Sequence, residues 1–203
     1  NNLDLSSVLD AGDFFGYGIS LDGNRLAVGA IFDDGAGNTL SDSGAVYLFN
    51  FSDAAFSNPT HTSTLGNGYS GGTNLNLNGT LDAVDRFGTA VSLDANRLAV
   101  GAIFDDGQGN SSSNSGATYL LTFADASFST PTHVSTLGSG YTGGKNLNLS
   151  SVLDAGDFSA GAVSLDGDRL AIGSPLDDAL GNGVDGAGAV HLISFSDAAF
   201  SSP

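Results

Sequence analysis

Apolar and polar residues alternate along several short stretches of the chain. In GTAVSLD at 88–94 they change with a period of two, which predicts a half-buried strand. A two-residue turn of the hairpin type leads into a second predicted strand, RLAVGAIF at 97–104. A third strand is predicted at 116–123 and a short fourth strand at 132–137. Polar loops separate these stretches, so the pattern predicts four short antiparallel strands.

The same pattern recurs with a period of 72 residues: RLAVGAIFDDG, for example, occurs letter for letter at 25–35 and 97–107. A fixed period of this kind is typical of one supersecondary unit copied in tandem. We therefore divide the chain into a first unit at 1–72, a second at 73–144 and an incomplete third at 145–203. Four antiparallel strands per unit favour an all-β fold, a β-propeller segment that is part of a larger ring or fibre. A parallel β-helix has much shorter repeats.

The period also predicts the core. Leu26, Val28, Val46 and Leu48 stand on the second and third predicted strands of the first unit. Because each unit buries its apolar face against the next, we expect these residues, and their counterparts 72 and 144 residues on, to be buried between neighbouring sheets.

The charge narrows the choice of partner. The chain has 22 acidic residues, all of them Asp, against 5 basic ones, which gives a net charge of −17. This balance argues against nucleic acid and against an anionic membrane surface, both of which are bound through Lys and Arg. No apolar run approaches the ~20 residues that span a bilayer, so no membrane insertion is expected. With neither a first Met nor a signal peptide visible, we interpret the sequence as a mature or internal piece of something longer.

The run at 85–121 resembles an FG-GAP repeat. That family is named for a Phe-Gly before the first strand and a Gly-Ala-Pro after the second; Phe87-Gly88 and Gly101-Ala102 stand at those places, without the Pro. The third unit departs from the motif with Ser159-Ala160 but restores the Pro in Gly-Ser-Pro at 173–175. The resemblance implies β-propeller blades like those of integrin α-subunit heads and of many large prokaryotic surface proteins.

Calcium is the first candidate ligand that the resemblance raises, because many FG-GAP blades carry a DxDxDGxxD loop between the first two strands. Here that junction, SLDGNRL at 20–26, is a turn too short to encircle an ion. The loop after the second strand is a second candidate, and it offers oxygen ligands in each unit: Asp33, Asp34, Asn38, Asp42, Asp105, Asp106, Asn110, Asp177, Asp178, Asn182 and Asp185. Two interpretations stay open: a calcium loop, or an Asx-type turn whose carboxylates cap backbone N–H groups.

A further set of charged residues recurs once in each unit, which an active site rarely does. Its members are Asp13, Asp85, Asp157, Arg25, Arg97 and Arg169. We interpret them as structural: the aspartates cap a turn or pair with the arginines, and the set joins one blade to the next. No catalytic motif and no cofactor site is predicted, and four N-x-[ST] sequons are possible glycosylation sites: Asn50, Asn78, Asn110 and Asn148.

These features favour a non-enzymatic, extracellular structural or adhesive module of a large prokaryotic surface protein or filament. The alternative is a calcium-dependent propeller domain that binds a ligand or glycan. Further copies of the repeat or neighbouring subunits are the expected partners, and a host or cell-surface protein or glycan is another. The third unit has no counterpart of residues 60–72, and the next chain could donate the missing fourth strand.

Overall fold

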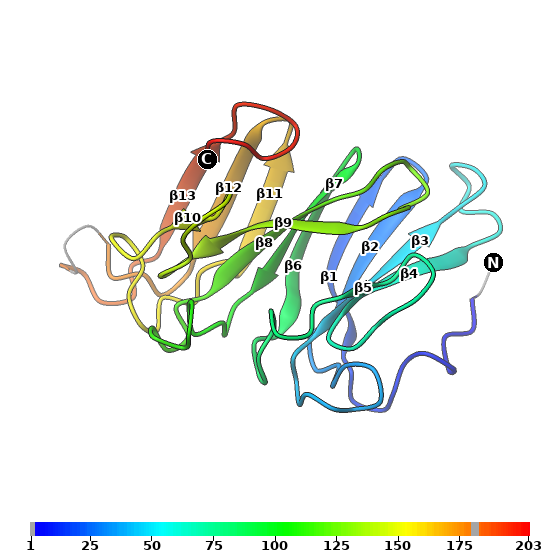
Figure 1. Ribbon diagram of the computed structural model, residues 1–203, viewed down its shortest axis with the longest axis horizontal. Helices are drawn as coiled ribbons and strands as arrows, with labels where there is room; N and C mark the ends of the chain where they lie inside the picture. Colours follow the sequence, from blue (N-terminus) through cyan, green and yellow to red (C-terminus); the bar gives the residue numbers. More distant parts are fainter. Residues whose placement is uncertain (1–2, 180–182) are drawn as a thin grey trace.

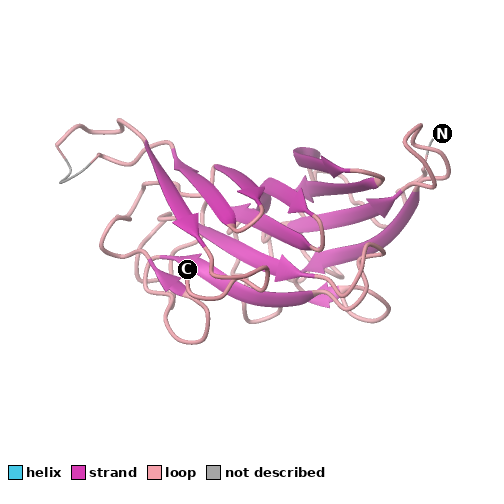
Figure 2. Cartoon of the chain, turned by 90° about the horizontal axis from the view of Figure 1, so that it is seen from above, coloured by secondary structure: helices cyan, strands magenta, loops and turns pink. Residues whose placement is uncertain are grey.

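The computed structural model describes residues 3–179 and 183–203, and in these residues every regular element is a strand. Figures 1 and 2 show strands joined by turns and loops, so the all-β prediction is confirmed. The described residues form no helix long and apolar enough to cross a membrane.

The first sheet has its strands in chain order. They are β1 (Phe15–Asp22), β2 (Arg25–Ala30), β3 (Ala45–Asn50), β4 (Thr60–Gly66) and β5 (Leu75–Asn76). The neighbouring strands from β1 through β4 pair antiparallel, whereas β5 pairs parallel with β4. This two-residue fifth strand is not part of the predicted four-strand pattern.

The second sheet repeats this arrangement with β6 (Phe87–Asp94), β7 (Arg97–Ala102), β8 (Ala117–Thr122), β9 (Thr132–Gly138) and β10 (Leu147–Asn148). The third sheet has three strands: β11 (Ala162–Asp166), β12 (Arg169–Ser174) and β13 (Ala189–Ser194). β7 ends at Ala102, two residues before the predicted end of that strand, because the chain turns at Ile103. Among the described residues the three sheets do not close into a ring.

Tight turns set the register of the first hairpin in each sheet. The turn between β1 and β2 has a positive φ of 58° at Gly23, and the equivalent residues Ala95 and Gly167 have 49° and 56°. A positive φ at the first turn residue matches the right-handed twist of the flanking strands. The hairpins therefore pair Asp22 with Arg25 and repeat that pair in the other two sheets.

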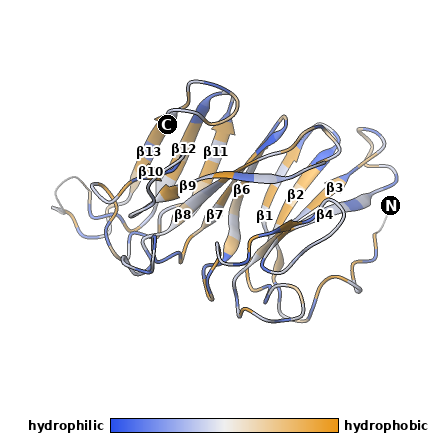
Figure 3. Cartoon of the chain, viewed as in Figure 1, coloured by the Kyte–Doolittle hydropathy of each residue, from blue (hydrophilic) through white to orange (hydrophobic). Residues whose placement is uncertain are grey.

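The three sheets stand side by side, with β1, β6 and β11 next to one another (Figure 1). The strands β1 to β3 and β11 to β13 contain many hydrophobic residues (Figure 3). One cluster of buried residues joins the first sheet to the second, and another joins the second to the third. The apolar surfaces that face one another are therefore buried between neighbouring sheets, as in stacked repeats.

Most of the predicted core is buried. Val28, Val46 and Leu48 are buried in the first unit, as are their counterparts in the second, and Leu26 is half-buried. The prediction is wrong for Val190 and Leu192, which are 66% and 81% exposed. These two side chains lie on the face of the third sheet that is turned away from the second, where no described residue covers them.

Candidate functional site

The loop after the second strand of each unit is held by a buried carboxylate. Asp33 accepts a hydrogen bond from Tyr47 Oη at 2.6 Å, another from Tyr69 Oη at 2.9 Å, and one from the Gly35 amide at 2.8 Å. Asp105 has the same three kinds of partner in the second unit. Burial raises the pKa of both carboxyls, while these hydrogen bonds favour the charged form.

The second aspartate of each pair folds the loop back on itself. The Oδ1 of Asp34 accepts the amide of Asp42 at 2.7 Å, and Asp106 accepts the amide eight residues on at 2.6 Å. Asp178 does the same at 2.7 Å, while Asp177 accepts the Ala179 amide at 2.8 Å. The carboxylates of these loops thus serve as caps for backbone N–H groups.

Three of the other predicted calcium ligands lie at the exposed surface of these loops. Asn38 and Asn110 are exposed and have left-handed backbone angles, Asp185 is exposed, and Asn182 lies outside the described residues. Over 3–179 and 183–203, no three His, Cys, Asp or Glu side chains come together in a group that could hold a metal ion. Calcium binding by these loops therefore stays a prediction.

The recurring aspartates that precede the first strand are also caps. Asp13 accepts the Asp10 amide at 2.7 Å, and Asp85 and Asp157 do the same for the residues three before them. All three are buried, and burial raises the pKa of each carboxyl. Of the two alternatives that we gave for these aspartates, the described residues show the cap, and their salt bridges to the recurring arginines involve other aspartates.

The arginines pair instead with the aspartate across the hairpin turn. Arg97 Nη2 lies 2.6 Å from Asp94 Oδ2, and Arg25 contacts its equivalent, Asp22. Arg97 also reaches the third sheet, where Nη1 lies 3.2 Å from Asp168 Oδ1 and the guanidinium lies over the ring of Phe200 at 5.6 Å. These contacts of Arg97 lie between neighbouring units, where we expect the recurring arginines to act.

Arg25 makes the equivalent contacts between the first and second sheets. Its Nη1 lies 3.5 Å from Asn96 Oδ1, and its guanidinium lies over the ring of Phe128 at 5.5 Å. Arg169, on the third sheet, pairs with Asp166 at 2.5 Å and is 77% exposed.

Side chains on the first strand of one sheet also bind the backbone of the next sheet. Ser20 Oγ accepts the Leu93 amide at 2.9 Å, and Asp22 Oδ2 accepts the Ala95 amide at 3.0 Å. Ser92 and Asp94 repeat both contacts toward the third sheet at the same distances. Sequence reasoning missed this set, although Ser-Leu-Asp recurs at a step of 72 with both polar side chains on one face of a strand.

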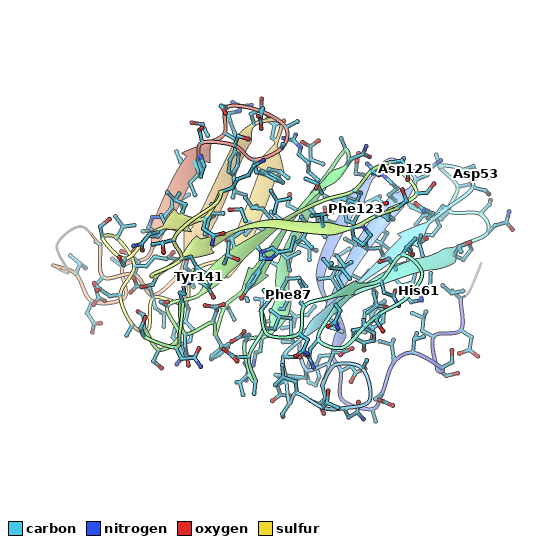
Figure 4. The ribbon with its side chains drawn as sticks, viewed as in Figure 1. Asp53, His61, Phe87, Phe123, Asp125 and Tyr141 are labelled. Carbon is cyan, nitrogen blue, oxygen red and sulfur yellow. The ribbon has the colours of Figure 1, made fainter. Side chains whose placement is uncertain are left out.

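Backbone also meets backbone between the sheets. The amide of Phe87, labelled in Figure 4, donates to the Ser43 carbonyl at 2.9 Å. The Gly88 carbonyl then lies against Gly29, so closely that a Cβ at Gly29 would stand 2.0 Å from its oxygen. Only glycine permits this approach of two chains.

The second junction has the same construction. The Ser159 amide donates to the Ser115 carbonyl at 2.9 Å, and a Cβ added to Gly101 would stand 2.2 Å from the carbonyl oxygen of Ala160. The substitution of Phe-Gly by Ser-Ala in the third unit therefore leaves the backbone contact in place.

A stack of rings runs across the sheets near these junctions. The Arg86 guanidinium lies over Phe32 at 4.7 Å and over Phe104 at 4.0 Å. Phe14 and Phe158, its counterparts at a step of 72 residues, contact the same two rings edge-on. The guanidinium thus links the ring of the first sheet to the ring of the second through cation–π contacts.

The sequons are the last of the predicted sites, and the histidines are assigned no role. Asn78, Asn110 and Asn148 are exposed, whereas Asn50 is half-buried and donates to Thr62 Oγ1 at 3.2 Å. Glycosylation of these sites stays a prediction. His61, labelled in Figure 4, is half-buried against Thr and Ser oxygens of its own strand, and burial lowers its pKa.

A family model described as the FG-GAP repeat matches residues 6–49 and 81–121. The chain contains FG-GAP repeats. A comparison with curated proteins finds no match. The geometry gives the name a physical meaning: the Phe-Gly that opens one FG-GAP repeat lies against the Gly of the Gly-Ala that ends the second strand of the repeat before it. FG-GAP repeats are typically extracellular adhesive or structural modules.

Proposed function

We propose that this chain is a non-enzymatic, extracellular segment with a structural or adhesive role in a large prokaryotic surface protein or filament, in which its FG-GAP repeats form β-propeller blades. The family supports this, because FG-GAP repeats are generally non-catalytic modules of this kind. The net charge of −17 is compatible with a surface that repels nucleic acid and anionic lipid.

One observation carries the proposal: the recurring polar residues are used in contacts within and between sheets. The buried Asp33 and Asp105 accept hydrogen bonds from tyrosines and backbone amides, and Arg97 links the second sheet to the third. An active site instead breaks a repeat at a few polar positions and leaves reactive groups facing a cleft.

The alternative, a calcium-dependent binding domain, has no specific observation in its favour. The described residues assemble no group of three acidic or imidazole side chains fit for a metal ion. A hollow beside the loop of the first unit measures about 460 Å³ and is lined by Asp10, Asp13, Asp33 and Asp34. Of these carboxylates, Asp33 is already bonded to two tyrosines, and Asp13 and Asp34 each accept a backbone amide.

The proposal is tested on intact cells of the producing organism. Antibodies raised against the chain should label intact cells, and external protease should remove that label while a cytoplasmic marker survives. Deletion of the segment should reduce attachment to surfaces, or remove a surface structure, without loss of growth. Labelling that requires permeabilised cells would overturn the extracellular part, and unchanged attachment and surface structure after deletion would overturn the structural or adhesive part.

A further inference from the structure

The first sheet leaves apolar side chains of β1 uncovered. On β1, Ile19 is 63% exposed and Leu21 is 52% exposed. Their counterparts on β6, Val91 and Leu93, are buried against the first sheet. We name this side of the first sheet, with Ile19 and Leu21, the upstream face.

The third sheet leaves the opposite side uncovered. Val190 and Leu192 on β13 are the two most exposed large apolar side chains of the described residues. Their counterparts in the first sheet, Val46 and Leu48, are buried against the second sheet. We name this side of the third sheet, with Val190 and Leu192, the downstream face. The upstream and downstream faces are thus the two halves of an interface that the chain itself forms between its own sheets.

The downstream face also has an open seat for a Phe-Gly backbone. Gly173 is the counterpart of Gly29 and Gly101, which receive a carbonyl of the next sheet. The three atoms nearest to a Cβ added at Gly173 all belong to Ala162, in its own sheet, and the nearest lies 3.5 Å away. Gly173 and Gly188 line a hollow of about 580 Å³ that opens beside Val190.

The third sheet also carries one partner of each polar contact that joins neighbouring sheets. Ser164 and Asp166 occupy the places of Ser20 and Asp22, whose side chains accept two amides of the following sheet. Arg169 occupies the place of Arg25 and Arg97, and its guanidinium forms a salt bridge with Asp166. The matching groups on a first sheet would be the amides of Leu21 and Gly23, with Asn24 for the guanidinium.

We propose that a second copy of this chain docks head to tail, with its upstream face on the downstream face of the first copy. The proposal rests on the structural role given above and names the partner. In the docked pair, Phe15-Gly16 of the second copy lies in the seat of Gly173 and Gly188. Ile19 and Leu21 cover Val190 and Leu192, so both exposed apolar sets leave water together.

The second copy also brings the segment that the interface needs. At the junction of the first and second sheets, Leu77 and Leu81 of the connecting segment are buried in the shared core. Their counterparts Leu5 and Leu9 already pack against the first sheet. A second copy therefore carries its own connecting segment into the contact, and the interface repeats the internal one except for the part that β4 contributes.

Because the two faces differ, the contact is heterologous, and it grows into a filament unless the rotation closes a ring. The test uses the full chain in sedimentation velocity at increasing micromolar concentration and near-physiological salt. Wild-type protein should sediment as more than a monomer. Leu192→Asp and Ile19→Asp each block one face at a side chain exposed in the monomer, so both should fold, as judged by circular dichroism, and sediment as monomers.

An equimolar mixture of the two variants decides between this contact and any other. One face remains intact in each variant, so the mixture should form a dimer of one copy each that grows no further. Val152→Asp is the matched control: this exposed valine lies in the segment that connects β10 to β11, and the variant should associate like wild type. A monomeric wild type, association that survives either variant, or a mixture that stays monomeric would each overturn the proposal. Surface labelling of cells is independent of all these outcomes.

Discussion

At the scale of single residues, the buried aspartates have the most unusual environment. Asp85 caps the Asp82 amide from a buried position near Asp105 and Asp106. Burial raises the pKa of this carboxyl to about 8, and repulsion from Asp105, Asp82 and Asp106 adds to the effect. Near neutral pH the folded protein therefore favours the protonated form of a group that is ionised in the unfolded chain.

Asp85→Asn should raise the melting temperature at pH 8. The folded pKa, about 8, lies above the unfolded value near 3.8, so the wild-type carboxyl contributes full stability below pH 3.8 and loses it as the pH rises toward 8. The amide keeps an oxygen for the Asp82 amide and cannot ionise. The gain from Asp85→Asn should therefore be largest near pH 8 and vanish near pH 4, which thermal unfolding across this range measures.

Asp125→Asn is the control, because it makes the same Asp-to-Asn change in an exposed loop. Hydrogen bonds from Ser129 and Ser127 lower the pKa of Asp125, so its carboxylate stabilises the fold at neutral pH. This variant should be no more stable than wild type at pH 8. Equal stabilisation by both substitutions would mean that net charge alone, and not the burial of Asp85, sets the pH dependence.

At the scale of the strand, identical sequence positions have different roles in different sheets. Gly101 on β7 faces the backbone of Ala160, whereas Gly173 on β12 faces open space on the downstream face. The two glycines share a strand position and differ only in the sheet that covers them. They therefore form a matched pair for measuring how much the junction between sheets contributes to stability.

Gly101→Ala should destabilise the protein by about 1–3 kcal/mol, the usual cost of overpacking. The added Cβ would stand 2.2 Å from the Ala160 oxygen, so the third sheet must move away. Gly173→Ala should leave the stability of the monomer unchanged or raise it by up to about 1 kcal/mol, because it restricts the unfolded chain without a clash. Urea unfolding of the two variants at low protein concentration compares them; equal effects would contradict this account of the junction.

The strands and their hairpins could be predicted from the sequence because alternation and turn residues are local signals. The parallel strand Leu75–Asn76 could not, since two residues carry no period. Val190 and Leu192 have the same pattern as Val46 and Leu48, and only the presence of a neighbouring sheet decides their burial.

The residues of the candidate site could also be predicted from the sequence only in part. The period places one recurring Arg and several Asp in every unit, so it cannot tell which Asp pairs with Arg97. Asp94 does so because the tight hairpin brings these two residues opposite each other, while Asp85 lies beyond the first strand. The role of Gly101 in receiving a carbonyl is a contact between units, and no local pattern encodes it.

At the scale of the whole molecule, the charge distribution governs the response to cations. The net charge of −17 attracts cations of every kind, and its self-repulsion weakens the compact state at low ionic strength. A specific calcium site would add a second effect that depends on the identity of the ion, because Ca²⁺ requires 6–8 oxygen ligands at fixed positions. The two effects can be separated by comparing salts at equal ionic strength.

We expect chelation to leave the fold intact and to lower the melting temperature only slightly. In the loop of the first unit, Asp33 is bonded to two tyrosines and Asp34 to the Asp42 amide, so these oxygens have partners without a metal. NaCl and CaCl₂ at equal ionic strength should therefore restore the melting temperature of an EDTA-treated, low-salt sample to similar extents. If unfolding of the treated protein were reversed by Ca²⁺ alone, and Asp34→Asn abolished that rescue, the loop would be a calcium site and the cation response would not be screening.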